Sequence, residues 1–139
     1  GAVAGLATVT PAAGFVGLFS ALFIGVVAGA ACYGAVVWKS RLGYDDSLDV
    51  VGIHGVGGVL GILATGLFAS IGAQGLFFGK PGQFGVQLLT AGGSLVFAFL
   101  GTLVILKLVD WAVGLRVAVD EEERGLDISQ HEERAYSQM

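Results

Sequence analysis

In a chain of 139 residues only 13% are charged, whereas 55% are hydrophobic and 24 residues are glycine. Soluble domains are about one quarter charged, so this composition excludes an ordinary soluble domain and indicates helices that span a membrane. The net charge of −4 arises after residue 115, and no basic stripe predicts binding to nucleic acid.

Three stretches of the sequence contain no charged residue, over 1–38, 50–79 and 81–106. A membrane core about 30 Å thick requires about 20 apolar helical residues. The two later stretches therefore each hold one span, and the first holds more than one. The chain begins with Gly1 instead of methionine and is apolar from the start, so we expect a piece of a longer polypeptide without a signal peptide.

The first predicted element is the end of a span over residues 1–10. It stops there because Pro11 disfavours the helical conformation in the residue before it. The first complete span is predicted over 18–38. Within it Gly25 and Gly29 lie four residues apart on one helical face, a spacing that favours close packing of a second helix.

A polar loop follows over 39–49, and the next span is predicted over 50–71. Asp49 directly precedes this span, where a carboxylate accepts hydrogen bonds from the free N–H groups of a helix, so Asp49 is predicted to be its N-cap. The last span is predicted over 84–114, and it is long enough to tilt or to extend into water.

The basic residues predict an orientation. Lys39 and Arg41 lie at the same membrane surface as Arg116, which follows two spans later. Loops rich in lysine and arginine stay in the cytoplasm. We therefore expect residues 1–115 to form the membrane domain and residues 116–139 to form a cytoplasmic C-terminal tail.

His54 is the most informative residue, because it lies inside the second uncharged stretch. An imidazole facing lipid is costly, so the ring must face protein or a water-filled cavity. Four glycines surround it and remove side-chain bulk: Gly52, Gly55, Gly57 and Gly58. One interpretation is a buried histidine that is hydrogen-bonded across a helix interface. Metal binding is disfavoured, because no second ligand follows at helical spacing.

The other interpretation of His54 is a role in transport. A neutral imidazole has one donor and one acceptor, so it can hold a small polar molecule or pass a proton without adding charge to the membrane interior. Ammonium and potassium ions are similar in size, but only ammonium can give up a proton before it enters an apolar pore. The sequence contains no nucleophile–base set and no metal cluster, so we expect no enzymatic activity, no catalytic residue and no cofactor.

Several segments of the chain resemble the ammonium transporter (Amt/Mep/Rh) family, in the family's order. They are TPAAGFV (10–16), IGVVAG (24–29), DVVGIHGVGG (49–58), GLRV (114–117) and EEERGLDISQHEERAY (121–136). The third segment resembles the signature around a pore histidine, and the last two resemble the cytoplasmic tail. The GVGG continuation and the GLD of the tail favour the microbial Amt branch over the Rh branch.

The resemblance implies an all-α polytopic membrane protein of eleven spans in the plasma membrane, assembled as a homotrimer with one pore in each chain. This chain would carry the end of span eight and all of spans nine, ten and eleven, with the C-terminus in the cytoplasm. His54 would be the second member of a pair of pore histidines, with Asp49 at the cytoplasmic entrance and Val50 lining the lower pore wall. The first histidine and the outer gate would lie in the upstream half of the same transporter, so this chain would not conduct ammonium or ammonia alone.

For the tail, the resemblance implies packing beneath the pores, contact with neighbouring subunits, and a docking surface for a PII-type signalling protein. The tail residues that carry the resemblance are Gly125, Leu126, Asp127, His131 and Tyr136. The sequence departs from the family at Glu132, where the family usually has glycine. The acidic run over 120–123 is also typical of a solvated helix face.

Two alternatives stay open beside an ammonium transporter. The first is an ammonium sensor or PII-recruiting regulatory protein on the same fold, which would bind ammonium with little turnover. The second is an unrelated multi-span transporter, which would lack a second histidine within its membrane domain. The transported species is also open: NH3, NH4+, or NH3 with a separately carried proton.

Overall fold

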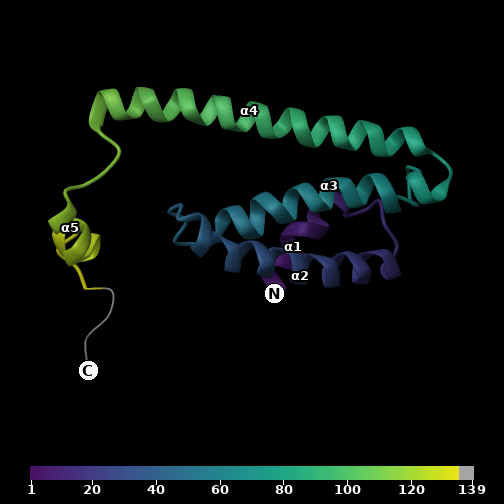
Figure 1. Ribbon diagram of the computed structural model, residues 1–139, viewed down its shortest axis with the longest axis horizontal. Helices are drawn as coiled ribbons and strands as arrows, with labels where there is room; N and C mark the ends of the chain where they lie inside the picture. Colours follow the sequence, from purple (N-terminus) through teal and green to yellow (C-terminus); the bar gives the residue numbers. More distant parts are fainter. Residues whose placement is uncertain (135–139) are drawn as a thin grey trace. The chain divides into compact units, whose positions relative to one another are not determined.

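The computed structural model describes residues 1–134, and over this range the chain is helical and contains no strand (Figure 1). The helices are α1 (Ala2–Val9), α2 (Leu18–Leu42), α3 (Gly57–Phe68), α4 (Pro81–Val113), α5 (Val119–Arg124) and α6 (Leu126–Ser129). Short 3-10 turns cover Thr10–Ala12 and Leu76–Phe78, and a π-helical segment over Val51–Val56, the π turn, leads directly into α3. The all-α fold predicted from the sequence is confirmed.

Three helical stretches have the length and hydropathy of membrane spans within the described residues. They are α2, the π turn continued by α3, and α4, with mean hydropathies of 2.0, 1.7 and 2.1. A membrane core requires about 20 residues, and α4 exceeds this with 33. A shorter apolar helical stretch over Ala2–Ala12, which contains α1, precedes the three spans.

The structure divides into two compact units, of which the first covers Gly1–Val96. In this unit α1 packs against both α2 and α3 (Figure 1). The buried centre consists of Ala12 from the 3-10 turn after α1, Ile24 from α2 and Ala64 from α3, with Val16 and Phe68 beside them. Small side chains at this centre let the helices approach closely.

Within the described residues, helices approach closely at glycines of α3. A Cβ on Gly61 would overlap the carbonyl oxygen of Thr8, so only glycine fits beneath α1. No described residue lies within 4 Å of a Cβ placed on Gly25 or Gly29. The packing of a second helix on Gly25 and Gly29 therefore stays a prediction; within this chain the buried residues of α2 are Ile24, Ala28 and Cys32.

The ends of the spans have specific local causes. Helix α3 ends at Phe68, three residues before the predicted end, because the N–H groups of Ser70 and Ile71 donate to the carbonyl of Phe15 at 2.8 and 3.1 Å. Helix α4 begins at Pro81, where a fixed backbone angle and a missing N–H suit the first helical position. It ends before Gly114, which has a φ of 79°.

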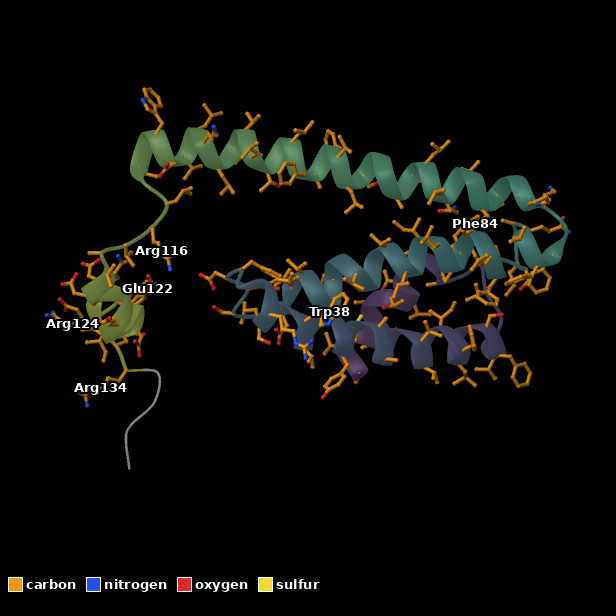
Figure 2. All side chains as sticks on the ribbon, viewed as in Figure 1. Trp38, Phe84, Arg116, Glu122, Arg124 and Arg134 are labelled. Atoms are coloured by element: carbon orange, nitrogen blue, oxygen red, sulfur yellow. The ribbon has the colours of Figure 1, made fainter. Side chains whose placement is uncertain are left out.

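The second unit begins at Phe97 and contains the end of α4 together with α5 and α6. Helices α5 and α6 are separated by Gly125, whose φ of 91° favours glycine. The hydroxyl of Ser129 donates to the carbonyls of Gly125 at 3.0 Å and Glu121 at 3.3 Å. Figure 2 shows the charged side chains of this part of the chain, including Arg116 and Glu122.

Candidate pore histidine and its surroundings

His54 lies in the π turn that opens the second apolar span. A π-helical turn contains one more residue than an α-helical turn, and such segments are frequent at functional sites. Around it the turn is packed on one side only: Gly52 and Gly57 are buried, whereas His54 and Gly55 are exposed. The imidazole is thus presented on the side of the turn that residues 1–134 leave uncovered.

No hydrogen bond from a residue within 1–134 to the His54 ring is present in the structure. No group of three or more His, Cys, Asp or Glu side chains able to hold a metal ion occurs in this part of the chain. Within the described residues, the ring therefore remains accessible to a small polar molecule.

The chain entering the π turn is capped by Asp46. Its two carboxylate oxygens accept hydrogen bonds from the N–H groups of Val50 and Val51, both at 2.9 Å. Asp49 was predicted as the N-cap, and this prediction is wrong. Its backbone has a φ of 57°, and its carboxylate turns away from the helix to pair with Lys39.

The structure brings the predicted pore residues into one continuous segment. Asp49 ends the loop, Val50 follows with about half of its surface exposed, and His54 lies one turn further on. The carbonyl of Asp49 accepts the N–H of Ile53 at 2.9 Å, which connects the loop to the turn.

Two residues near this segment were not predicted as site residues. Lys39 had been used only to orient the chain, and Asp46 had been taken as a loop residue. The available signal was the spacing of two acidic residues three positions apart before a span, since either can cap it. The backbone conformation at Asp49 decides between them.

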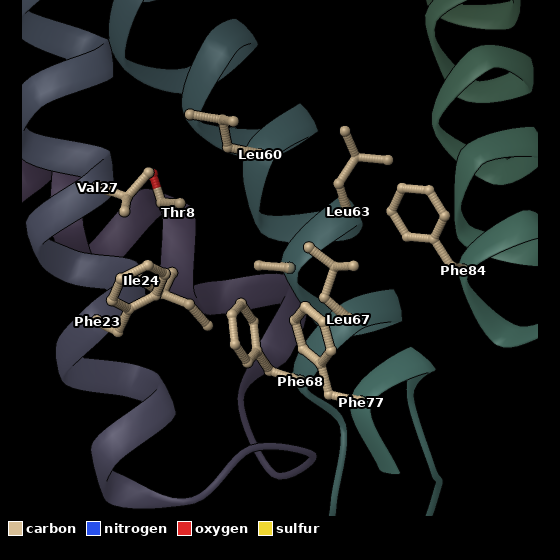
Figure 3. A pocket seen from close by; sticks show the side chains of 11 residues that line it. Thr8, Phe23, Ile24, Val27, Leu60, Leu63, Leu67, Phe68, Phe77 and Phe84 are labelled. Atoms are coloured by element: carbon tan, nitrogen blue, oxygen red, sulfur yellow. The ribbon is translucent and has the colours of Figure 1, made fainter. Parts of the chain in front are cut away.

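The first unit also contains an apolar cavity of about 420 Å³ between α1, α2, α3 and the start of α4 (Figure 3). Its lining includes the aromatic rings of Phe23, Phe68 and Phe77. The centroid of the Phe68 ring lies 5.6 Å from that of Phe23 and 5.2 Å from that of Phe77, and both ring pairs are tilted. Thr8 is the only lining residue with a polar side chain, and its buried hydroxyl has no hydrogen-bond partner within 1–134. The cavity offers no acid–base chemistry.

In the tail, Gly125 joins α5 to α6, Leu126 begins α6, and the carbonyl of Asp127 accepts the N–H of Glu133 at 2.9 Å. His131 is exposed in the turn that follows. Tyr136 lies outside the described residues.

The departure at Glu132 has a structural counterpart. Its φ is 53°, in the left-handed region that glycine adopts without strain. Glu132 therefore adopts a backbone conformation that favours glycine, the residue that the resemblance leads us to expect at this position.

Comparisons with known proteins show which family the chain belongs to. The model of the Ammonium Transporter Family matches residues 1–136. The chain is 49% identical to ammonium transporter Amt1 of Archaeoglobus fulgidus, over 99% of this chain and 36% of the relative. It is 46% identical to the ammonium transporter of Bacillus subtilis, over 98% of this chain and 35% of the relative.

Solved structures agree with the sequence comparisons. The crystal structure of Saccharomyces cerevisiae Mep2 matches with a TM-score of 0.76 and 39% identity, over 85% of this chain and 29% of that chain. Mep2 of Candida albicans matches with a TM-score of 0.77 and 35% identity, over 86% and 29%. The chain spans about a third of the length of the curated relatives it matches. The resemblance and the fold class expected from the sequence are confirmed, and the chain belongs to the ammonium transporter family, as part of a multi-pass membrane protein.

Proposed function

We propose that the protein containing this chain moves ammonium or ammonia across a membrane through a pore in which His54 is a lining residue. The observation that carries this proposal is an exposed imidazole on a π turn inside an apolar span. A histidine in a membrane span is costly unless it faces protein or water, so its presence there favours a functional role such as lining a pore.

The chemistry of a neutral imidazole fits a pore that admits ammonia and excludes potassium. The ring supplies one N–H donor and one nitrogen acceptor, which match the lone pair and the N–H groups of ammonia. An ammonium ion that leaves its proton at the pore entrance passes as a small polar molecule. A potassium ion has no proton to leave, so it carries its full charge into the apolar interior and is excluded.

The remainder of the pore is assigned to the upstream part of the transporter. In this proposal it supplies the first pore histidine and the outer gate, since the chain covers about a third of its relatives. His54, Val50 and Asp49 then form the cytoplasmic half of the conduction path. The path needs no enzymatic step and no bound cofactor.

The same proposal includes the assembly and the orientation. Lys39 and Arg41 lie at the end of α2, which favours a cytoplasmic position for that end and for the tail after α4. The multi-pass protein lies in the plasma membrane as a homotrimer. The tail residues from Gly125 to His131 form part of the surface for a PII-type signalling protein.

A sensor on the same fold is the second candidate, and the formed tail favours it. The Ser129 hydroxyl of α6 donates to the carbonyl of Glu121 in α5, and the N–H of Glu133 joins the segment after α6 to Asp127, so the tail offers a defined surface to a partner. A sensor would bind ammonium and recruit that partner with little transport.

The test uses the full-length protein in liposomes and records the current after an ammonium pulse. We expect a saturating ammonium current without potassium current, and loss of the current or of its selectivity in His54→Ala. The control is Thr90→Ala, at an exposed position of α4 whose hydroxyl bonds to the carbonyl of Val86 in its own helix. An ammonium current that is the same in His54→Ala and in the parent would refute the pore role. Recruitment of a PII-type protein without any current would establish the sensor.

A further inference from the structure

The π turn that carries His54 is held by one face of α2. Three residues of this face contact the π turn or the loop before it: Cys32, Val36 and Lys39, spaced by four and three positions. Residues at this spacing lie on the same side of a helix. Each of them contacts a different point of the loop and the π turn.

The first two contacts lie against the turn itself. The thiol of Cys32, which is 1% exposed, lies 3.9 Å from the carbonyl oxygen of Ile53 and donates to it. Val36 closes over Gly52, where a Cβ would lie 2.9 Å from its Cγ2 and 3.3 Å from its backbone nitrogen. The turn can approach α2 this closely only because Gly52 has no side chain.

The third contact is polar and lies where the chain enters the turn. The ammonium group of Lys39 donates to the carbonyl of Asp46 at 2.6 Å and forms an ion pair with the carboxylate of Asp49. Asp46 is also the residue whose carboxylate caps the N–H groups of Val50 and Val51. The Lys39 side chain thus ties Asp46 and Asp49 to the end of α2.

The pair with Lys39 acts at a residue with an unfavourable backbone conformation. Asp49 has a φ of 57°, a conformation that costs about 1–2 kcal/mol for a residue with a side chain, although aspartate tolerates it better than most. A π turn also needs support from its surroundings to persist beside the commoner α form. Lys39 supplies that support through Asp46 and Asp49, where the chain enters the turn.

We propose that Lys39 is a positioning residue: through Asp46 and Asp49 it maintains the π turn and so sets the place of the His54 ring. This inference rests on the proposed role of His54 in the pore. Without the ammonium group, Asp49 can leave the left-handed conformation. The π turn can then convert to an ordinary α-helical turn, which shifts the His54 ring from its position in the proposed pore.

The test compares variants of the full-length transporter in liposomes. Lys39→Met keeps the length and the apolar stem of the side chain but removes both polar contacts. Lys39→Arg keeps the charge and serves as the conservative rescue. Arg41→Met removes a charge from the same turn of α2 at an exposed position, so it controls for the change in surface potential.

We expect Lys39→Met to lower the ratio of ammonium to potassium current by about tenfold, because even in enzyme active sites a misplacement of about 1 Å costs up to about a hundredfold in rate. Lys39→Arg retains most of the selectivity, and Arg41→Met retains all of it. A purely structural role would lower the amount of folded protein and leave the ratio unchanged. Equal ratios in Lys39→Met and the parent would overturn the proposal.

A second measurement keeps the inference testable if Lys39→Met conducts too little to assign a ratio. An experimental structure of this variant is expected to show Asp49 outside the left-handed region and an α-helical turn around His54. An unchanged π turn would overturn the proposal. The two hypotheses separate cleanly: an effect of His54→Ala without an effect of Lys39→Met refutes only the positioning role, whereas no effect of His54→Ala refutes the pore role itself.

Discussion

The guanidinium of Arg116 donates two hydrogen bonds to the carboxylate of Glu122, from Nε to Oε2 at 3.1 Å and from Nη2 to Oε1 at 2.9 Å. Arg116 lies just after α4, and Glu122 lies in α5. The pair therefore spans the short connection between α4 and α5. Its two side chains are largely exposed, so it orients this connection more than it stabilises the fold.

We predict that the Arg116–Glu122 pair depends on pH. The hydrogen bond and the charge of Arg116 lower the pKa of Glu122 below its ordinary value of 4.5. Because the folded-state pKa is the lower one, the pair contributes fully above about pH 4.5 and is lost as the pH falls through the folded-state pKa. A 13C titration of glutamate in the full-length protein measures this, with the signal assigned by its absence in Glu122→Gln. Arg116→Gln is expected to raise the pKa; an identical titration in this variant would contradict the assignment.

Glu132 predicts a stabilising substitution. Its left-handed backbone costs a residue with a Cβ about 1 kcal/mol more than glycine. Glu132→Gly is therefore expected to slow hydrogen exchange of the next amide, Glu133, about fivefold, because that N–H closes the turn onto the carbonyl of Asp127.

The matched control for this substitution is Glu132→Ala, which removes the same charge but keeps the Cβ. We expect it to leave the exchange of the Glu133 amide near that of the parent. Equal slowing in Glu132→Ala and Glu132→Gly would mean that charge, and not backbone conformation, limits the turn.

The long helices could be predicted because hydropathy and charge alone define them. Three uncharged stretches and Pro11 were enough to place α1, α2, α3 and α4 in order. The site was harder. Asp46 and Asp49 both precede the span, and only the left-handed backbone at Asp49 shows which carboxylate faces the free N–H groups.

The glycines illustrate the same limit. The sequence contains 24 of them, and small-residue spacing favoured Gly25 and Gly29 as packing positions. Which glycines touch a neighbour depends on how α1 lies across α3, and the pairing of Gly61 with Thr8 has no local signal. The π turn likewise packs against α2, a contact that the uncharged stretch used to predict this span does not show.

The aromatic cluster predicts a graded loss of stability at Phe68. Its ring contacts Phe23 of α2 and Phe77 of the loop before α4, at centroid distances of 5.6 and 5.2 Å. Phe68→Ala is expected to destabilise the transporter by about 2–4 kcal/mol, and Phe68→Leu by about 1 kcal/mol, since leucine refills most of the volume. Thermal unfolding in detergent measures both. Equal melting temperatures for the two variants would show that the cluster does not hold these segments together.

Two glycines of α3, three residues apart, are expected to respond to alanine in opposite directions. A Cβ on Gly61 would overlap the Thr8 carbonyl and press on the ring of Pro11, so Gly61→Ala must push α1 away from α3. Overpacking of this kind costs about 1–3 kcal/mol, and the upper end applies because the obstructing atom belongs to the backbone. A Cβ on Gly58 meets no described atom within 4 Å, so Gly58→Ala is expected to stabilise the helix by about 0.5–1 kcal/mol. Melting temperatures of the full-length protein therefore fall for Gly61→Ala and rise for Gly58→Ala. Shifts of the same sign and size would mean that the α1–α3 contact is absent from the assembled transporter.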